Sequence, residues 1–516
     1  MKLVTSDLMR SIDRETIDIV GIAGPDLMEN AGRGIAFGIL TDIASQHDDD
    51  AKLSFAIFCG KGNNGGDGYV VGRYLHEAGH DVAFYFLGPV EKLSDDAKLN
   101  YERARKLKLE FVELKTTEDF PDELECDYIV DAVFGTGFEG APKGIASDVI
   151  EYMNYQEHPI IAVDLPSGLN ADNGSCEGAA VVADFTYTLA LPKYGLYVSP
   201  GRELAGQVQV VPIGVPDNVV EKFDIQNELI THEYVTEALP YRKPDGHKGD
   251  FGTVFIIAGS TGLTGAAALA AKSALRGGCG LARVGCPRTV LPIIASSVIE
   301  ATTMPLPDVA KKGALALRGL GEIRQAAVEH DAVIIGPGIG RHRETFELVR
   351  RLVVSVERPM IIDADGVNAL EGHLDLFHEA GGPIVLTPHP GEFKRLTGIA
   401  VPDDIHMRIA VAREFATEYK AVLVLKGSPT IVADEEGICY VNQTGNNGMA
   451  TGGSGDVLSG LIGSFMAQGL EPLDAALCGV YVHGFAGDIA AWSLTDRALI
   501  ASDLIDALPD VFELFE

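Results

Sequence analysis

Residues able to do chemistry gather first in a glycine-rich segment, GNNGGDG, at Gly62–Gly68. Its backbone amides precede a predicted helix, where they can hold an anionic group. Counted from Gly62 or from Gly66, the dinucleotide fingerprint GxGxxG does not fit, because Asn64 and Val71 respectively occupy places of its glycines. Asn63, Asn64 and Asp67 instead add oxygens that suit a hard cation, or hydrogen bonds to a sugar or an amide. A tight turn, in which Asn and Asp supply left-handed conformations, is the alternative.

Further polar groups follow two predicted strands of the first half. Asp131 comes shortly before the segment Gly135-Thr136-Gly137, and Asp164 comes shortly before Ser167. The carboxyl ends of parallel strands meet at one edge of a sheet, so we expect these groups to share one crevice. One carboxylate could be neutralised by a cation while the other moves protons. Asp164 could also simply cap the next helix.

A second glycine-rich segment, residues 445–456, runs directly into an apolar helix and carries Asp456 in its first turn. Free amides and the helix dipole favour an anion there. An acid at this point can accept a proton from a substrate hydroxyl during phosphoryl transfer. An ordinary capped helix is the alternative. His389 could bind substrate or only hydrogen-bond backbone, and Lys426 could bind a nucleotide or be a surface cation.

Short apolar runs alternate with helical patterns in the first half, which predicts a parallel sheet covered by helices on both faces. These predicted strands lie within residues 53–60, 81–88, 127–135, 159–168, 183–190 and 206–214. A helix over residues 24–40, opened by Pro25 and Asp26, is expected to pack against this sheet or against a second subunit. The helix after GNNGGDG is expected to begin near Tyr69.

A similar series of predicted strands and helices fills the second half. Its strands lie within residues 252–260, 281–287, 331–340, 358–366, 381–393 and 421–434. Two long apolar-faced helices, over 453–469 and 472–492, close the chain. Residues 215–250 are polar and lack the strand pattern, and 516 residues exceed one ordinary core. We therefore predict an α/β protein of two domains, residues 1–225 and 226–516.

Composition and charge exclude several classes of partner. The formal net charge of -33 and the pI of about 4.7 would repel a phosphate backbone and anionic lipids, so neither nucleic acid nor a membrane is expected as a partner. The first residues resemble no secretory signal, and no apolar run reaches the length of a membrane span. The 7 cysteines form no CxxC pair, which favours buried reduced thiols in the cytoplasm.

The first half resembles the NAD(P)H-hydrate epimerase family. The resemblance rests on the order and spacing of LMRSIDRETID, GPDLMENAG, GNNGGDG, DAVFGTG and VDLPSGL. It implies a Rossmann-like three-layer sandwich, a bound potassium ion and epimerisation of hydrated nicotinamide dinucleotides. Potassium would be held by Asn64, Asp131 and Ser167. Substrate contacts would come from Asn63, Asn64, Gly65, Gly66, Asp67, Gly135, Thr136, Gly137, Phe138, Glu139, Gly140, Ala141 and Asp164.

The second half resembles ribokinase-like enzymes through the motif GxGD, within their ADP-dependent NAD(P)H-hydrate dehydratase branch. Supporting segments are HKGDFGTVFIIAGS, GPGIG, DADGVNAL, TPHPGEFKRL and LKGSPTIV. The resemblance implies an α/β/α domain in which Ala266, Gly338, His389 and Asp456 contact the hydrated dinucleotide. The nucleotide would be held by Lys426, Gly427, Ser428, Pro429, Thr430, Asn446, Asn447, Gly448, Met449, Ala450, Thr451, Gly452, Gly453, Ser454 and Gly455.

Together the two resemblances imply repair of damaged dinucleotides. One half would interconvert the R and S forms of NADHX and NADPHX, with Asp164 hypothesised to give and take the proton. The other would dehydrate the S form with ADP and Mg²⁺, with Asp456 as base, giving AMP and phosphate. A homo-oligomer is expected. The alternatives are a small-molecule hydroxyl kinase fused to a dinucleotide-binding domain, and a non-catalytic binding or scaffold protein.

Overall fold

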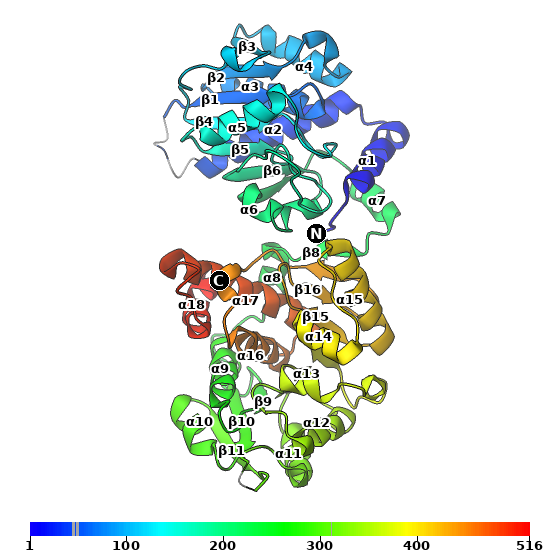
Figure 1. Ribbon diagram of the computed structural model, residues 1–516, viewed down its shortest axis with the longest axis vertical. Coiled ribbons are helices and arrows are strands. Elements are labelled where there is room, and N and C mark those ends of the chain that lie inside the picture. The colour runs from blue at the N-terminus through cyan, green and yellow to red at the C-terminus, as the bar shows by residue number, and fades with distance from the viewer. Residues whose placement is uncertain (44–46, 48–50, 311, 516) are drawn as a thin grey trace. The chain divides into compact units, whose positions relative to one another are not determined.

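The computed structural model describes residues 1–43, 47, 51–310 and 312–515. The chain divides into two compact units, Met1–Asn227 and Glu228–Glu516 (Figure 1). Each unit is an α/β domain built on its own sheet, which confirms the predicted fold class.

The described part of the first unit contains a 7-stranded sheet in the order β3-β2-β1-β4-β5-β6-β7. Every neighbouring pair in it is parallel. The strands are β1 Ser54–Cys59, β2 Asp81–Leu87, β3 Glu110–Leu114, β4 Tyr128–Ala132, β5 Ile160–Val163, β6 Phe185–Leu189 and β7 Gln207–Val211. The winding direction reverses between β1 and β4, and such a reversal opens a crevice at the carboxyl ends of the strands.

Both faces of this sheet are buried. Along β1, Phe55, Ile57 and Cys59 pack into the core under α2 and α3, whereas Ala56 and Phe58 pack into the core under α5. This period-2 alternation between two apolar cores explains why the strand is apolar throughout. The helices are α1 Ser6–Glu15, α2 Gly24–Ile43, α3 Asn63–Glu77, α4 Asp95–Arg105, α5 Ile145–Tyr155, α6 Gly201–Ala205 and α7 Asp217–Val220.

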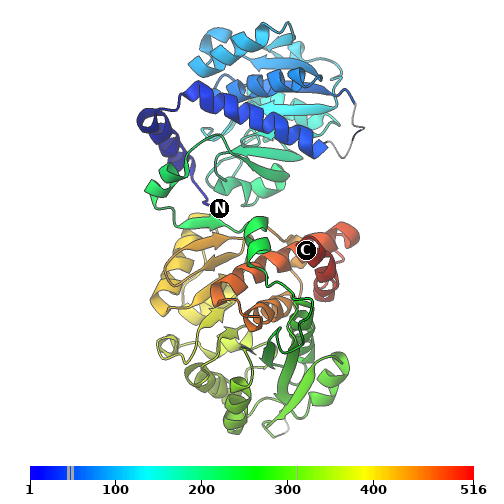
Figure 2. The same cartoon turned by 180° about the vertical axis from the view of Figure 1, so that it is seen from behind.

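Helix α2 contacts α3 and strands β6 and β7, as expected for a helix packed on the sheet (Figure 2). Helix α3 differs from the sequence prediction, because it begins at Asn63 and its first turns contain GNNGGDG. Glycine is a poor helix former, but a Cβ on Gly66 would lie 2.6 Å from Met28 and one on Gly68 would lie 2.6 Å from Ala132. Close packing therefore explains these glycines.

The second unit contains, among the described residues, a 10-stranded sheet in the order β11-β10-β9-β12-β13-β14-β15-β16-β17-β8. Strands β11 to β15 pair in parallel, whereas β15, β16 and β17 pair antiparallel. The strands are β8 Asn227–Leu229, β9 Thr253–Ile257, β10 Leu281–Pro287, β11 Thr302–Leu306, β12 Ala332–Ile335, β13 Met360–Ile362, β14 Ile384–Leu386, β15 Val422–Leu425, β16 Ile431–Ala433 and β17 Cys439–Val441. Here the winding reverses between β9 and β12.

Helices cover this sheet as well. One apolar core contains residues of α8, α9, α10, α16, α17 and α18, together with Val254, Ile256 and Ile334 from the sheet. The remaining helices include α12 and α15, whose buried residues lie outside that core. The helices are α8 His232–Ala238, α9 Thr264–Arg276, α10 Leu291–Ser297, α11 Leu320–Val328, α12 Arg343–Ser355, α13 Asp365–Ala369, α14 Pro390–Thr397, α15 Ile405–Tyr419, α16 Ser454–Ala467, α17 Pro472–Leu494 and α18 Ala501–Glu513.

Several elements were not predicted. The polar edge strand β3 and the strands β8, β11 and β17 had no clear apolar run, and α18 follows the two helices expected to close the chain. All seven cysteines are free, but Cys126 and Cys176 are only half-buried, unlike the prediction that all would be buried. Among the described helices, none is both long and apolar enough to cross a membrane.

Candidate functional site

The first crevice lies beside the turn that joins β1 to α3. This turn is tight, because a Cβ on Gly60 would lie 2.0 Å from the Val133 carbonyl oxygen and one on Gly65 would lie 1.9 Å from the Gly60 carbonyl oxygen. The segment after β4 is therefore held against the start of α3. Asn64 is buried there, and its carbonyl oxygen lies 2.9 Å from the place of a Cβ on Gly135.

Asp164 follows β5 in a left-handed conformation, with φ of 67°. It is not a helix cap. Its Oδ2 accepts hydrogen bonds from the backbone N–H of Thr136, at 3.1 Å, and from the Thr136 hydroxyl. Its Oδ1 accepts from Lys193 Nζ at 2.7 Å, and the two side chains are 8% and 1% exposed respectively. Burial alone would raise the pKa of Asp164, but the Lys193 charge and these hydrogen bonds lower it below its ordinary value.

Asp131 and Ser167, two of the expected potassium ligands, contact each other directly. Ser167 donates to the Asp131 carboxylate from its hydroxyl at 2.6 Å and from its backbone N–H at 2.7 Å. Burial raises the pKa of Asp131 to about 6, although these hydrogen bonds act in the opposite direction. The Ser167 hydroxyl also lies 3.3 Å from the Phe134 carbonyl oxygen, one residue before the glycine that Asn64 contacts.

This set of carboxylate, hydroxyl, amide and carbonyl oxygens has the donor chemistry that an alkali cation prefers. The Asn64 amide nitrogen is buried without a hydrogen-bond partner, so its side chain is not committed elsewhere. The residues present therefore fit potassium. Asn63, in contrast, is exposed and accepts a hydrogen bond from Ser94 at 2.7 Å.

In the second unit, the winding reversal brings two expected substrate contacts together. Gly338, with φ of 62°, follows β12, and a Cβ on it would lie 3.0 Å from Ala266 at the start of α9. The Gly338 carbonyl also accepts a hydrogen bond from Ser260 at 2.8 Å. This pair lies at the crevice between the strand ends of β9 and β12, as the fold requires of a ligand site.

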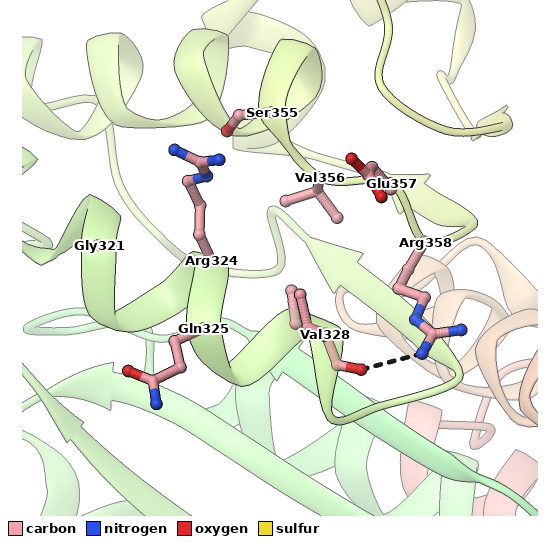
Figure 3. A pocket seen from close by; sticks show the side chains of 9 residues that line it. Gly321, Arg324, Gln325, Val328, Ser355, Val356, Glu357 and Arg358 are labelled. Carbon is pink, nitrogen blue, oxygen red and sulfur yellow. Dashed lines mark hydrogen bonds between the residues drawn. The ribbon is translucent and has the colours of Figure 1, made fainter.

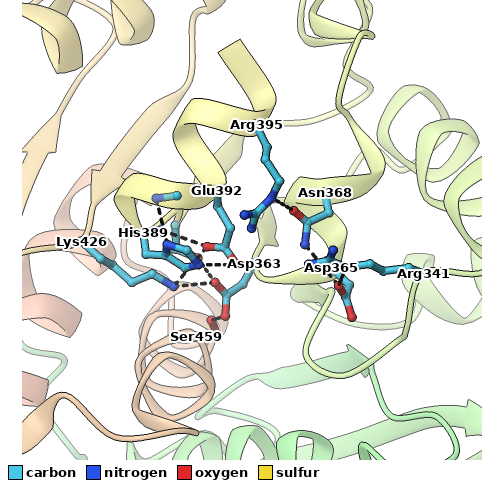
Figure 4. Close-up of polar contacts among 11 residues, drawn as sticks. Arg341, Asp363, Asp365, Asn368, His389, Glu392, Arg395, Lys426 and Ser459 are labelled. Carbon is cyan, nitrogen blue, oxygen red and sulfur yellow. Dashed lines mark hydrogen bonds and ion pairs between the residues drawn. The ribbon is translucent and has the colours of Figure 1, made fainter. Parts of the chain in front are cut away.

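A buried carboxylate, Asp363, ties together the ends of three neighbouring strands (Figure 4). It is 1% exposed and follows β13. It accepts hydrogen bonds from Thr387 at 2.8 Å, from Lys426 at 2.9 Å and from Ser459 of α16 at 2.8 Å. No role was predicted for Asp363 from the sequence. Lys426 is thus part of a buried ion pair and not a surface cation.

Lys426 also lies beside the amino end of α16. A Cβ on Gly455 would lie 3.1 Å from its Nζ, so the second glycine of GxGD leaves room for this ammonium group. Burial would lower the pKa of Lys426, but the carboxylates of Asp363, Glu392 and Asp456 raise it, so the group stays charged. A fixed cation, free amides and a helix dipole therefore meet at one point, where they can bind phosphate.

Asp456 lies in the first turn of α16, and no hydrogen bond to its side chain is found within the described residues. Burial raises its pKa to about 7, with further increases from Asp363, Glu392 and Asp365 that Lys426 partly offsets. A carboxylate that titrates near neutral pH is suited to take a proton from a substrate hydroxyl.

His389 caps α14, where its Nδ1 accepts a hydrogen bond from the Gly391 backbone at 3.0 Å. Its Nε2 lies 3.5 Å from Glu392, which in turn lies 4.0 Å from Lys426. Burial lowers the pKa of His389, and the Lys426 charge acts in the same direction, so the neutral imidazole is favoured. One ring nitrogen of His389 therefore accepts a backbone hydrogen bond, while the other faces the cluster formed by Glu392, Asp363 and Lys426.

A line of hydrogen bonds runs from α14, the helix that His389 caps, to the Gly338 side of the crevice (Figure 4). Asp365 accepts hydrogen bonds from the Gly340 backbone at 3.1 Å and from Asn368 at 3.2 Å. Asn368 accepts from Arg395 of α14 at 2.9 Å. These hydrogen bonds end at Arg395, and α14 itself joins Arg395 to His389, so one helix and one hydrogen-bonded chain connect the two regions expected to hold the dinucleotide.

Two side chains, one buried and one half-buried, fix the two expected nucleotide segments. Arg408, 7% exposed, donates to the carbonyls of Ser428 and Pro429 at 3.1 and 2.9 Å. Asp488 of α17 accepts from the Gly445 backbone at 2.8 Å and from the Asn446 side chain at 2.9 Å. Neither had been expected.

A cavity of about 460 Å³ lies elsewhere in the second unit (Figure 3). It is lined by residues such as Arg324, Ser355 and Arg358, the last of which donates a hydrogen bond to the Val328 carbonyl at 2.9 Å. Val328 and Arg358 precede β12 and β13, so this cavity lies at the amino ends of strands whose carboxyl ends carry the site. No expected site residue lines it.

Sequence reasoning missed Lys193, Asp363, Glu392, Arg408 and Asp488. A signal existed for Asp363, because it follows β13 just as Asp164 follows β5, while Asp131 lies near the end of β4. Lys193, in the apolar segment TYTLALPKYGLYV, could have been noticed as its only charge.

Comparisons with known proteins agree with this two-part arrangement. The family model described as NAD(P)H-hydrate dehydratase matches residues 254–510, and the one described as YjeF-related protein N-terminus matches residues 24–195. A Bacillus subtilis structure, an ADP/ATP-dependent NAD(P)H-hydrate dehydratase co-crystallised with ATP/Mg²⁺, is 35% identical and covers 56% of this chain and 99% of that one, with a TM-score of 0.49.

Two full-length relatives carry the name bifunctional NAD(P)H-hydrate repair enzyme Nnr. The protein from Moorella thermoacetica is 42% identical, over 100% of this chain and 97% of the relative. The one from Thermofilum pendens is 39% identical, over 99% of this chain and 96% of the relative. Because such similarity spans the chain from end to end, the chain belongs to the family of bifunctional NAD(P)H-hydrate repair enzymes.

Proposed function

We propose that residues 1–225 interconvert the R and S forms of hydrated NADH and NADPH, and that residues 226–516 dehydrate the S form with ADP. The observation that carries this proposal is the site at the start of α16, where Lys426, Gly455 and Asp456 meet. A dehydratase that accepts one epimer needs the other to be converted, and the first unit would supply that step.

In the first unit, we infer that the dinucleotide lies along the turn after β1 and the segment after β4. The proposed contacts are Asn63, Asn64, Gly65, Gly66, Asp67, Gly135, Thr136, Gly137, Phe138, Glu139, Gly140, Ala141 and Asp164. Asn64, Asp131 and Ser167 would hold potassium, which would supply positive charge near the substrate. Asp164, which Thr136 and Lys193 hold in place, would face the hydrated ring.

In the second unit, hydroxide is a poor leaving group, so the ring hydroxyl must first be activated. Asp456 would accept the hydroxyl proton as the oxygen attacks the terminal phosphorus of ADP, which breaks the bond to AMP. Lys426 and the amides at the start of α16 would stabilise charge on the transferring group. Loss of phosphate from the ring carbon, with loss of a ring proton, then restores the dihydronicotinamide.

The proposed substrate contacts of this unit are Ala266, Gly338, His389 and Asp456. The proposed nucleotide contacts are residues 426–430 and 446–455. Within the described part of the chain, no three His, Cys, Asp or Glu side chains gather as a metal site. Mg²⁺ would therefore enter with the nucleotide phosphates and neutralise part of their charge.

We further propose that the chain acts as a homo-oligomer in the cytoplasm. Support for assembly comes from exposed apolar side chains, namely Phe37 of α2 at 73% and Trp492 of α17 at 92%. Seven free thiols are typical of a reducing compartment.

One assay tests both activities. A mixture of both NADH hydrate epimers is supplied with ADP and Mg²⁺, and the return of dihydronicotinamide absorbance is followed. We expect full recovery with the native chain and none with Asp456→Asn. If only the S epimer is converted back to NADH, the chain is a dehydratase without epimerase activity. No recovery, together with nucleotide-dependent phosphorylation of an added small alcohol, would replace the proposal with a hydroxyl kinase.

A further inference from the structure

Epimerisation needs an acid that protonates the ring hydroxyl, and Lys193 is not free to serve. Its ammonium group has three N–H bonds. These are directed at Asp164 at 2.7 Å, the Thr188 hydroxyl at 3.0 Å and the Leu189 carbonyl at 2.7 Å. The side chain is also 1% exposed, so no hydrogen is left for a substrate.

Asp164 is equally committed. Its Oδ1 accepts from Lys193, from the Leu189 backbone at 3.2 Å and from Thr188 at 3.3 Å. Its Oδ2 accepts both hydrogen bonds of Thr136. A carboxylate surrounded by donors, one of them charged, is stabilised as the anion. Asp164 therefore has no proton to give and little tendency to take one, contrary to the hypothesis made from the sequence.

Asp67 has the opposite environment. It lies in the second turn of α3, directly after the turn that closes β1 at the winding reversal, and it is 7% exposed. No described residue donates a hydrogen bond to its carboxyl group. A buried carboxylate without donors is strongly disfavoured, whereas a neutral carboxyl group keeps an O–H to give.

The charges that face Asp67 act in the same direction. Burial raises its pKa well above the ordinary value, and the carboxylates of Asp164, Asp13 and Asp96 raise it further, with Lys193 as the single opposing charge. Asp67 and Asp164 therefore form a pair of acids whose environments separate their protonation states. Such separation is how two carboxyl groups in one site come to hold different roles.

We propose that Asp67 is the acid that protonates the ring hydroxyl in the epimerase site, while Asp164 remains an ionised anchor. This inference rests on the proposed epimerisation and names the group that drives it. It also extends the expected role of Asp67, which the sequence resemblance gave only as a substrate contact.

The proposed step is balanced in atoms and electrons. The Asp67 proton passes to the hydroxyl oxygen, the carbon–oxygen bond breaks with its pair going to the departing water, and the ring nitrogen lone pair forms a carbon–nitrogen double bond. The Asp67 carboxylate and Asp164 then face a ring cation. When water adds to the other face, the double-bond pair returns to nitrogen and the added water releases one proton to solvent, while Asp67 takes one proton from solvent and regains its carboxyl group.

Asp13 of α1 is the competing acid. Burial raises its pKa to about 6, and its Oδ1 is buried without a partner. It is less buried than Asp67, however, and lies on a helix that does not follow a strand of the sheet. The test must therefore compare the two acids directly.

The experiment uses the full chain with one purified epimer of NADH hydrate and no nucleotide, and chromatography follows the appearance of the other epimer. The variants are Asp67→Asn, Asp67→Glu and Asp13→Asn, with Asp95→Asn on the exposed surface of α4 as the matched control. Dehydration of the S form with ADP by the same protein reports the second unit, and hydrogen exchange of β4 and β5 amides reports folding of the first.

We expect Asp67→Asn to lower kcat for epimerisation by about 100-fold or more, with KM changed far less. The native rate should fall at high pH as the acid ionises, and Asp67→Asn should lose this fall whereas Asp67→Glu keeps it. Normal epimerisation by folded Asp67→Asn, or loss of the alkaline fall in Asp13→Asn instead, would overturn the inference. A native chain that dehydrates but never epimerises would instead remove the proposed epimerase function.

Discussion

Lys426 and Asp363 form an ion pair of 2.9 Å in which the carboxylate is 1% exposed and the ammonium group 20%. Because Asp363 also accepts from Thr387 and Ser459, the pair joins strand ends to the helix that carries Asp456. Asp363 thus holds Lys426 in position, and its charge is also one of the causes that raise the pKa of Asp456.

Asp363→Asn should shift the pH dependence of dehydration. Asp456 acts as a base, so the native rate should rise with pH through about 7, the value to which burial and Asp363 bring its pKa. Loss of the Asp363 charge removes one cause of that increase, so the rise should move to lower pH. We also expect a roughly tenfold lower kcat, because Lys426 loses its anchor. Profiles of kcat/KM against pH check this, with exposed Asp375→Asn as control. An unmoved profile would contradict it.

Asp456→Asn should lose activity yet gain stability. Removing the base should lower dehydration by about 10²–10⁴-fold. Since folding raises the pKa of Asp456 from 3.8 to about 7, stability is complete below 3.8 and is lost as pH rises toward 7. That loss is at most about 1.4 kcal/mol per pH unit in this range. Hydrogen exchange of β12 and β13 amides should therefore show the variant to be more stable than the native chain at pH 8, with a smaller difference at pH 5. Equal stability at both pH values would argue against a buried, uncompensated Asp456.

Two glycines of the first turn should respond differently to alanine. A Cβ on Gly65 would lie 1.9 Å from a backbone oxygen, whereas one on Gly62 meets nothing within 4 Å. Gly65→Ala should therefore destabilise the first unit by about 1–3 kcal/mol or more, and Gly62→Ala by less than about 1 kcal/mol. Hydrogen exchange of β1 amides in the two variants gives the comparison. If both substitutions cost the same, the close approach of α3 to this turn is not what selects glycine.

The strands that were predicted are those that pack against helices on both faces of their sheet. Burial on both faces leaves a continuous run of apolar residues in the sequence, and that run can be recognised. The start of α3 at Asn63 was not predicted, since three glycines in its first six positions oppose a helix unless neighbouring elements press against them. Packing against Met28 and Ala132 determines where the helix begins, and the local sequence pattern carries no sign of that packing.

The candidate sites were predicted where a polar residue directly follows a strand. What could not be predicted is which groups pair. Lys193 reaches Asp164 across 29 residues, and Lys426 reaches Asp363 across 63. Without those partners, Asp164 was interpreted as an ordinary acid and base, whereas in the structure Lys193 and the hydrogen bonds to Asp164 lower its pKa. The protonation state of a carboxyl group depends on contacts between distant segments.

Lys193→Met should therefore destabilise the first unit strongly. Removing one partner of a buried ion pair leaves the other charge uncompensated and costs about 3–5 kcal/mol. With Lys193 present, the pKa of Asp164 is lowered by folding, so ionised Asp164 stabilises the folded chain at neutral pH. This stabilisation is lost only as the pH falls through the lowered pKa. Without Lys193, burial dominates and raises the pKa of Asp164, so the loss relative to the native chain should be largest at pH 8 and shrink toward pH 4.

Hydrogen exchange of β5 and β6 amides measures this loss, with two comparisons. Lys52→Met breaks a pair of 2.6 Å whose side chains are 59% and 65% exposed, so it should cost less than about 1 kcal/mol. The double variant Lys193→Met/Asp164→Asn should recover part of the loss, because the stranded charge is gone. If the double variant is as unstable as the two single variants combined, the pair is not coupled, and Asp164 would owe its ionisation to Thr136 and the backbone instead of Lys193.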